Sequence, residues 1–429
     1  MMDKHTFSLC PVCLKRIEAE YTKEGDTVYL IKECEEHGRF STAVWRGSPD
    51  MLLWCGNVTE GETNSRCPEL CGLCGYHLRD TCCALLNVTS RCNLKCGYCF
   101  AGDSRAEDPS MDYIRHCIGD MASRGITHLH LSGGEPTVRD DIPEIAEYAV
   151  KSGFKYIQLN TNGMRIAREK SYAKELADSG VSSVFLQFDG TDDKVYEAIR
   201  GKPIYSEKIK AIENCDDARL GVVLVPTLIP GVNDSQIGEI IKFGIRHIPA
   251  VKGIHFQPVT YVGRYPGLPA DSDRITIPEV LLAIENQTEG MIRKEQFSPS
   301  CCDHPMCGFH SEFIYENNKL RPLIKSRAKK SCCEDRKTSV RKNQNYVSVR
   351  WTRLKSCCSP ERPYSIDALL DNLRRNSFSI TGMAFQDEYN VDLNRLKHCS
   401  LHVYDNGRIM PFCAKYIYHD RVRRKLESE

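Results

Sequence analysis

The sequence lacks three features that would point to particular classes of protein. Its charges nearly cancel, with 58 Lys and Arg against 57 Asp and Glu and a net charge of +1, so the total charge makes no electrostatic case for nucleic acid or an anionic membrane, and we expect no nucleic-acid partner. It has no apolar run of about 18 residues, and Met1 to Phe7 form no apolar signal core. It contains no low-complexity tract. We therefore expect a soluble, cytoplasmic protein without a transmembrane segment.

Cysteine, in contrast, is abundant, with 23 residues in a chain of 429. Such a number suits a disulfide scaffold in a short secreted chain, whereas in a long cytoplasmic α/β protein it indicates metal sites. The length allows two or three domains. We predict a metal-binding ribbon over 1–50, a cysteine-rich segment over 51–83, a barrel over 84–265 and a cysteine-rich domain over 266–429.

The central motif is C-x3-C-x2-C, formed by Cys92, Cys96 and Cys99. This spacing lets one short loop turn three thiolates onto a [4Fe-4S] cluster. Three thiolates leave one iron open, which a reactive site needs and a structural site lacks. A structural zinc site is the alternative, but Gly133, Gly134 and Glu135 follow at the end of an apolar run and favour the reactive cluster.

Two further cysteine groups precede this motif. Cys10, Cys13, Cys34 and His37 have the spacing of a tetrahedral zinc or single-iron site, which would stabilise a small ribbon with a hairpin after the Gly25-Asp26 turn. The ribbon lacks the basic and aromatic run of a nucleic-acid binder.

Cys67, Cys71 and Cys74 repeat the C-x3-C-x2-C spacing, and Cys82 is a candidate fourth ligand, although Cys55, His77 and Cys83 are also near in sequence. A complete ligand set would close that cluster, so that it carries electrons or holds structure.

From residue 84 the sequence alternates between short apolar runs and helix-length segments. Strands are predicted at 84–89, 128–132, 156–160, 183–189, 220–227 and 254–259. Helices are predicted near 111–123, 142–151, 165–178, 206–214 and 235–247. Strands spaced in this way need right-handed crossovers, so the fold class is α/β, a partial (β/α)6 parallel barrel with an N-terminal metal ribbon and a cysteine-rich C-terminal extension.

Polar residues stand at the ends of several predicted strands, where chemistry collects in such barrels. They are costly to bury unpaired, so they either bind a cofactor or substrate or satisfy neighbouring backbone groups. The candidates for cofactor binding are Asn160, Asn162, Gln187, Asp189 and Gln257.

The segment after residue 265 loses the barrel pattern. Thr276 starts a helix with a capping box that ends near Thr288, and the basic stretch 325–342 is interpreted as a solvated linker. Cys307, Cys399 and Cys413 are the best single candidates for ligands of one or more auxiliary [4Fe-4S] clusters; the alternative is a set of reduced cysteines filling a small core. Four cysteine doublets also occur, at 82–83, 301–302, 332–333 and 357–358.

Residues 92–99 and 131–136 together resemble the radical S-adenosylmethionine (SAM) superfamily. The resemblance implies that the open iron chelates the amino and carboxylate groups of SAM, that the Gly133-Gly134-Glu135 strand end holds the amino group, and that Tyr98 lies near the adenine. The chain is also similar to one subgroup of this superfamily, which contains archaeal 7,8-dihydro-6-hydroxymethylpterin methylases and tetraether-lipid synthases. The similarity lies in the ribbon, in the two C-x3-C-x2-C motifs and in the segments 226–234 and 398–413. A bacterial selenoprotein branch is a further relative.

This resemblance implies that a reduced cluster on Cys92, Cys96 and Cys99 cleaves SAM to a 5′-deoxyadenosyl radical, which abstracts hydrogen from an unactivated carbon. The expected reaction is methyl or one-carbon transfer to a pterin-like or other small molecule. The alternatives are coupling of lipid alkyl chains, peptide modification or, in a different class, a non-catalytic iron–sulfur electron-transfer or sensor protein. The expected partners are a small-molecule substrate and an electron donor such as ferredoxin or flavodoxin.

Overall fold

The computed structural model describes residues 4–58, 65–101, 107–323, 336–353, 372–422 and 425. No helix among them is both long and apolar enough to cross a lipid bilayer.

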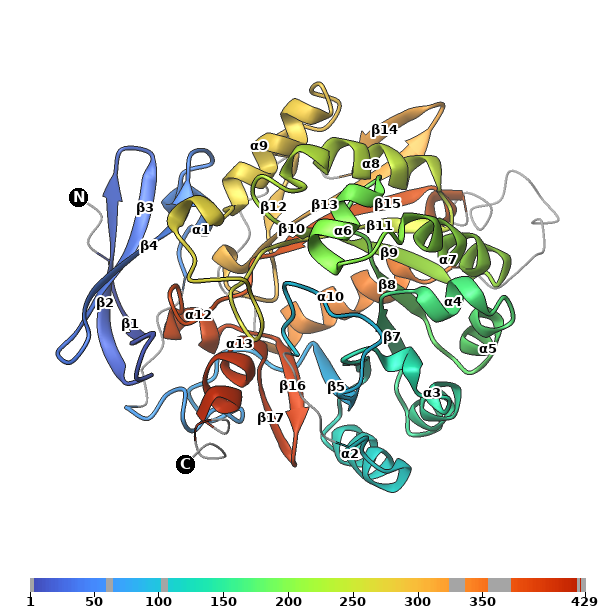
Figure 1. Cartoon of the computed structure of the whole chain (residues 1–429), viewed down its shortest axis with the longest axis horizontal. Helices are drawn as coiled ribbons and strands as arrows, with labels where there is room; N and C mark the ends of the chain where they lie inside the picture. The colour runs from blue at the N-terminus through green and yellow to red at the C-terminus, as the bar shows by residue number, and fades with distance from the viewer. Residues whose placement is uncertain are drawn as a thin grey trace.

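The N-terminal unit is a four-stranded antiparallel sheet in the order β1-β2-β3-β4. Its strands are β1 Lys4–Leu9, β2 Arg16–Glu24, β3 Thr27–Cys34 and β4 Gly38–Arg46. The predicted hairpin is confirmed, because β2 and β3 are joined by a tight turn in which Gly25 takes a positive φ of 59°. The ribbon lies beside the main body, at the left of Figure 1.

The main body is built on six parallel strands, which pair in chain order as a partial barrel. They are β5 Cys83–Thr89, β6 His128–Gly133, β7 Tyr156–Thr161, β8 Ser183–Gln187, β9 Gly221–Val225 and β11 Val251–Pro258. The short β10, Thr227–Leu228, also pairs with β11. Every residue of β9 is buried, as expected for a parallel strand covered on both faces. The predicted α/β barrel is confirmed.

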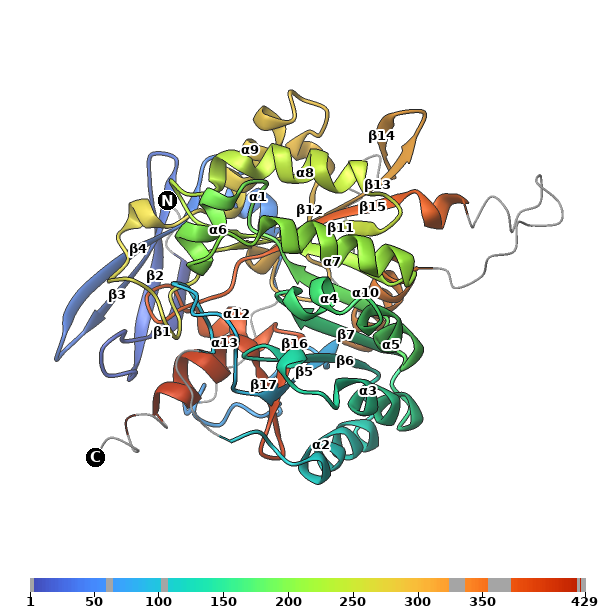
Figure 2. The same cartoon turned by 45° about the vertical axis from the view of Figure 1, so that its right-hand side comes forward.

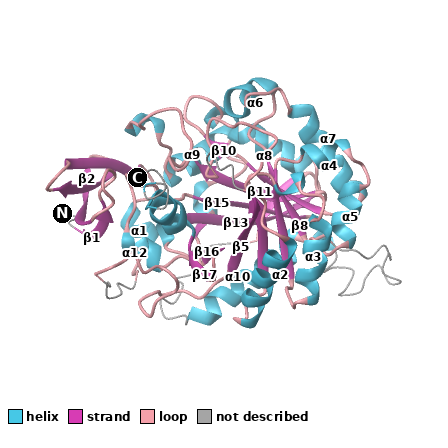
Figure 3. Ribbon diagram, turned by 60° about the horizontal axis from the view of Figure 1, so that its bottom comes forward, coloured by secondary structure: helices cyan, strands magenta, loops and turns pink. Residues whose placement is uncertain are grey.

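Helices pack on the outside of this sheet, as Figures 2 and 3 show. They are α2 Met111–Ser123, α3 Ile142–Lys151, α4 Met164–Arg168, α5 Tyr172–Asp178, α6 Asp193–Arg200, α7 Tyr205–Asp217 and α8 Ile237–Arg246. The single helix predicted at 165–178 is wrong, because Glu169 takes an extended backbone and separates α4 from α5. Helix α6 was not predicted, although the side chain of Asp192 caps it by accepting from the Val195 N–H.

The C-terminal region adds strands to both edges of the same sheet. Strand β15, Ser377–Met383, pairs in parallel with β11, and β16, Leu401–Asp405, pairs in parallel with β5. Antiparallel strands extend these edges, namely β12 Ser298–Pro299, β13 Gly308–Glu316, β14 Lys319–Pro322 and β17 Arg408–Pro411. The parallel pattern therefore continues beyond residue 265, and the predicted division at 265/266 stays a prediction.

The remaining helices are α1 Met51–Cys55, α9 Ile277–Gln287, α10 Arg336–Trp351, α12 Leu393–Lys397 and α13 Phe412–Ala414. The capping box predicted at Thr276 is present at the start of α9.

The described part of the stretch 325–342 lies in helix α10, so the interpretation of that part as a solvated linker is wrong. The helix covers the end of the barrel where strands begin: His128 Nε2 lies 2.9 Å from Ser348 Oγ, and the Trp351 indole donates to Ser379 Oγ at 2.9 Å. Val340 and Trp351 are buried, so apolar contacts hold a helix that is otherwise strongly polar.

Candidate active site

The cysteine loop follows β5 and is held by backbone hydrogen bonds to two distant segments. Gly97 N–H donates to the Ile199 carbonyl at 3.0 Å, and Cys99 exchanges hydrogen bonds of 3.0 and 2.9 Å with Arg264. Cys92, Cys96 and Cys99 all line one cavity of about 1220 Å³, which extends through the barrel to residues at the starts of strands, such as Cys83 and His128. The structure therefore brings together the three thiols predicted to hold the reactive cluster.

The strand end at 133–135 lies unusually close to this loop. A Cβ added to Gly133 would lie 2.1 Å from the Thr89 carbonyl oxygen, and one added to Gly134 would lie 2.3 Å from that of Arg91. The Gly134 and Glu135 N–H groups donate to these same carbonyls at 2.9 and 2.8 Å. Only glycine permits this approach, which fastens the end of β6 to the start of the cysteine loop.

The Glu135 carboxylate is buried and joins the ends of β6 and β7. Its oxygens accept hydrogen bonds from Thr137 Oγ1, Thr161 Oγ1 and Asn162 N, each at 2.6 Å. Asn162 Nδ2 donates in turn to Asn93 Oδ1 at 2.7 Å, inside the cysteine loop. Glu135 and Asn162 thus position the loop, while their contact with a cofactor stays a prediction.

Asp189 is fully buried and pairs with a residue that sequence reasoning missed. The Arg200 guanidinium donates to its two carboxylate oxygens at 2.7 and 2.8 Å. Burial lowers the pKa of Arg200, but the Asp189 carboxylate outweighs burial and raises that pKa above its usual value. Arg200 lines the cavity and interacts with the Cys96 thiol. Asp189 thereby holds a cation beside the cysteine loop. No local sequence signal singles out Arg200, because α6 reads as an ordinary amphipathic helix.

The other predicted polar residues, Asn160, Gln187 and Gln257, line the same cavity, as does Tyr98. Gln187 Oε1 accepts a hydrogen bond from Lys208 Nζ at 2.9 Å. Lys208 is a second buried cation that sequence reasoning missed; burial lowers its pKa to about 8, and it also donates to the Asn162 carbonyl at 2.6 Å.

Deeper in the barrel, the cavity wall is aromatic and imidazole-rich. The Phe185 ring lies 5.0 Å from that of Trp351 and 5.4 Å from that of His255. Burial lowers the pKa of His130 and of His255 to about 4, so both imidazoles are neutral at pH 7. The alternation of polar and apolar residues in β6 and β11 could have signalled these two histidines.

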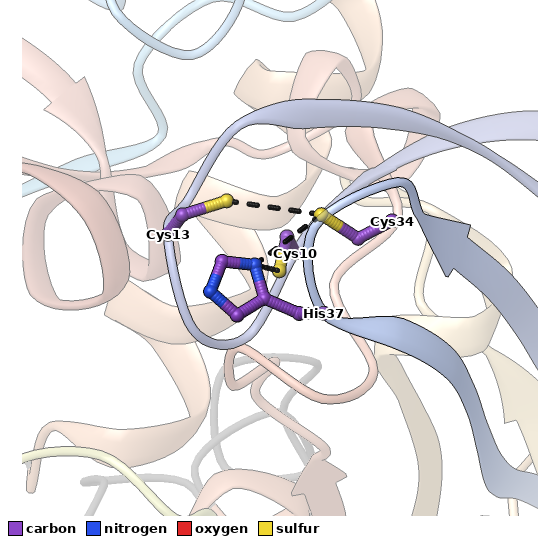
Figure 4. Close-up of side chains that lie close together, drawn as sticks. All are labelled: Cys10, Cys13, Cys34 and His37. Atoms are coloured by element: carbon purple, nitrogen blue, oxygen red, sulfur yellow. Dashed lines mark hydrogen bonds between the residues drawn. The ribbon is translucent and has the colours of Figure 1, made fainter.

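The ribbon residues form a compact donor set (Figure 4). The Sγ atoms of Cys10, Cys13 and Cys34 and one ring nitrogen of His37 all lie within 4.8 Å of one another. Cys34 Sγ lies 3.4 Å from His37 Nδ1 and 4.0 Å from Cys13 Sγ. These separations suit a tetrahedral ion with zinc–sulfur and zinc–nitrogen bonds of about 2.0–2.3 Å.

The other cysteines predicted as ligands fall into two places. Cys307, Cys399 and Cys413 line one small cavity, where Arg395 donates to Cys307 Sγ at 3.6 Å. Cys67 and Cys71 share a side-chain hydrogen bond, and the pKa of Cys71 is raised by Cys67, by burial and by the further thiols of Cys74 and Cys399. Cys82 lies elsewhere, in the wall of the large cavity.

Comparison with known proteins identifies this arrangement. Residues 86–244 match the model of the radical SAM superfamily, and residues 2–46 match that of the HMPTM N-terminal zinc ribbon domain. A 7,8-dihydro-6-hydroxymethylpterin dimethyltransferase of Methanocaldococcus jannaschii is 32% identical over 100% of this chain and 96% of its own length. This chain belongs to the radical SAM superfamily.

Other similar proteins match smaller shares of the chain. An Fe-coproporphyrin III synthase of Methanosarcina barkeri is 34% identical over 42% of this chain and 44% of its own length. The structure described as "Native anSMEcpe with bound AdoMet" is 20% identical over 48% of this chain and 59% of its own, with a TM-score of 0.39.

The radical SAM domain implies a [4Fe-4S] cluster and SAM, and the protein is a radical SAM enzyme. The residues present fit these groups, because three thiols share one loop and the glycine backbone approaches that loop as closely as sterics permit.

Proposed function

We propose that this radical SAM enzyme transfers a methyl or other one-carbon group to a small, planar, pterin-like heterocycle. The observation that carries the proposal is the full-length match to a pterin dimethyltransferase, which extends through the ribbon and the C-terminal region as well as the barrel. The wall of the cavity supports it. Aromatic rings stack on flat heterocycles. The amide of Gln158 and the neutral imidazoles of His130 and His255 can form hydrogen bonds with the ring nitrogens of such a substrate.

We assign the SAM-binding cluster to Cys92, Cys96 and Cys99. When bound, the cluster and SAM supply a 5′-deoxyadenosyl radical. Three thiolates leave one iron free for SAM, and the backbone of Gly133 and Gly134 is offered to its amino group. Asn160, Gln187, Gln257 and Tyr98 lie on the same cavity wall and would contact the rest of the nucleoside.

We assign further metal sites to the other cysteine groups. Cys307, Cys399 and Cys413 converge on one buried cavity, as ligands of an auxiliary cluster would. Cys67, Cys71 and Cys74 would hold another. Both would pass electrons between a ferredoxin- or flavodoxin-type donor and the reaction cavity. The ribbon would hold zinc or a single iron for structural stability.

The test is anaerobic incubation of the iron-reconstituted protein with dithionite, SAM, 7,8-dihydro-6-hydroxymethylpterin and a methylene-carrying folate-like compound as the one-carbon donor, because formation of 5′-deoxyadenosine leaves the methyl group of SAM on methionine. Mass spectrometry should detect 5′-deoxyadenosine and a pterin heavier by one or more methyl groups. A second reaction would contain a long-chain dialkyl lipid instead of the pterin, which tests the alternative that the enzyme couples alkyl chains. Cleavage of SAM with an unchanged pterin would refute the substrate class, and intact SAM in both reactions would refute the enzyme activity.

A further inference from the structure

Two histidines on the wall of the large cavity flank one aromatic ring. These chamber histidines are His130, on β6, and His255, on β11, and β8 lies between the two strands in the sheet. The centroid of the Phe185 ring, on β8, lies 6.5 Å from that of His130 and 5.4 Å from that of His255. Each histidine stands two residues before another wall residue, Ser132 or Gln257, so the pair lies about 7 Å deeper in the barrel than the strand ends. A flat ring that rests on Phe185 therefore has an imidazole near its edge on both sides.

A hydroxyl group on β15 fixes the nitrogen of His255 that carries the ring proton. His255 Nδ1 lies 2.8 Å from Thr381 Oγ1, and the Thr381 hydroxyl donates its single hydrogen to the Ile254 carbonyl at 3.3 Å. A hydroxyl that has donated its hydrogen can only accept, so the proton of His255 is on Nδ1. Because burial lowers the pKa of His255 to about 4, the imidazole is neutral at pH 7 and its Nε2 is a hydrogen-bond acceptor.

An amide group fixes His130 in the opposite sense. Gln158 Nε2, on β7, donates to Asn160 Oδ1 at 2.8 Å and lies 3.4 Å from His130 Nδ1. An amide nitrogen can only donate, so His130 Nδ1 accepts and the ring proton is on Nε2. Burial also lowers the pKa of His130 to about 4, so this neutral imidazole offers a hydrogen-bond donor at Nε2.

The Nε2 atoms of both rings are left for a ligand. Among the described residues, the hydrogen bonds of these two rings involve Nδ1 alone, and both side chains are only half-buried on the cavity wall. A third imidazole of the same wall, His128, differs, because its Nδ1 lies 3.0 Å from Thr127 Oγ1 and its Nε2 lies 2.9 Å from Ser348 Oγ. The cavity therefore presents one donor, on His130, and one acceptor, on His255.

We propose that the chamber histidines recognise and orient the flat heterocycle of the substrate: His130 donates a hydrogen bond to an acceptor on the edge of the ring, and His255 accepts one from an N–H group. The proposal rests on the proposed function and names the residues that would recognise its substrate. The pyrimidine ring of a pterin carries most of the molecule's donors and acceptors, so this ring would stack on Phe185 between the histidines. The carbon atoms of the second ring would then point towards the strand ends and the cysteine loop.

The test measures binding without turnover. The full-length, iron-reconstituted protein would be titrated anaerobically in a calorimeter, with SAM but without a reductant, using 7,8-dihydro-6-hydroxymethylpterin and, separately, hydroxymethylquinoxaline. The quinoxaline keeps two fused flat rings and the hydroxymethyl group, but benzene replaces the pyrimidine ring and its polar edge. We expect the wild type to bind the pterin about 100-fold more tightly, since each of the two hydrogen bonds contributes about 10-fold.

Three variants separate the histidines from the shape of the cavity. His130→Phe and His255→Phe keep a flat ring and remove both nitrogens, so each should weaken pterin binding by about 10-fold and leave quinoxaline binding unchanged. His247→Phe is the matched control and should bind both ligands as the wild type does. His247 is a half-buried histidine that follows α8, lies outside the wall of the cavity and has its Nδ1 2.8 Å from the Phe243 carbonyl oxygen.

The outcomes distinguish the proposal from the proposed function. Unchanged pterin affinity in either chamber variant, or an equal loss of affinity for both ligands, would overturn the role of the histidines and leave the proposed function standing. A wild type that does not bind the pterin would refute the proposed substrate class, and the role of the histidines with it.

Thr381 is a positioning residue in this account, and it has a test of its own. Thr381→Val removes the oxygen that accepts from His255 Nδ1, so the proton can move to Nε2 and the acceptor becomes a donor. We expect about 10-fold weaker pterin binding in Thr381→Val, wild-type binding in Thr381→Ser and unchanged quinoxaline binding in both. Equal pterin affinity in the two Thr381 variants would overturn the assignment of the His255 proton and the proposal that depends on it.

Discussion

The close approach at Gly134 makes a quantitative prediction for Gly134→Ala. The added Cβ would lie 2.3 Å from the Arg91 carbonyl oxygen and 2.7 Å from that of Ser90, whereas real Cβ contacts stay beyond 3.0 Å. The backbone must therefore move by at least 0.7 Å, the difference between 3.0 and 2.3 Å. Both obstacles are backbone atoms, so no side chain can rotate away to relieve the contact.

That movement displaces the cysteine loop, because Arg91 is directly followed by Cys92. A misplacement of about 1 Å in a catalytic site commonly costs about 100-fold in rate, and we expect a loss of this order in 5′-deoxyadenosine formation. The assay is the initial rate of SAM cleavage with dithionite, with iron content measured in parallel. Gly119→Ala in α2 is the matched control, since its Cβ would meet open space. Wild-type rates in Gly134→Ala would refute the argument that this backbone contact positions the loop.

Three further predictions concern the buried ion pair, the ribbon and the chamber histidines. Arg200→Met leaves the Asp189 carboxylate buried without its cation, so the unfolding free energy measured in urea titrations should fall by about 3–5 kcal/mol. Adding Asp189→Asn to this variant should recover much of the loss, and no recovery would contradict the pairing. Cys34→Ser should remove one metal equivalent by elemental analysis and expose 4–46 to protease while the barrel persists, and unchanged metal content would contradict the ribbon site. The pKa of His255 is lowered by burial from 6.5 to about 4, so the unfolded chain takes up this proton first as the pH falls, and this site alone should lower stability by about 2 kcal/mol between pH 7 and pH 5. The drop should therefore be smaller by that amount in His255→Gln than in the wild type, and an equal drop in the two proteins would contradict the role of His255.

Features with a local sequence signal were predicted well. The six core strands lie close to their predicted positions because parallel strands are short apolar runs bounded by turns, and α2 and α3 have the predicted bounds. The ribbon donors and the cysteine loop follow from spacing alone, since their ligands are brought together by one or two turns.

Features that depend on long-range pairing were missed. Strands β15 and β16 join the edges of the barrel although they follow β11 by more than a hundred residues, and no local pattern tells which sheet a strand joins. Arg200 owes its place to Asp189, and α10 owes its fold to contacts with β9, β11 and β15.

The measurement that tests the central claim most directly is SAM cleavage by three reconstituted proteins under identical anaerobic conditions. Wild type and Cys117→Ala, which alters a cysteine of the core, should both form 5′-deoxyadenosine. Cys96→Ala should form none, while it retains the metal of the ribbon and the iron of any auxiliary cluster. Cleavage of SAM by Cys96→Ala at the wild-type rate would contradict the assignment of the active site to Cys92, Cys96 and Cys99.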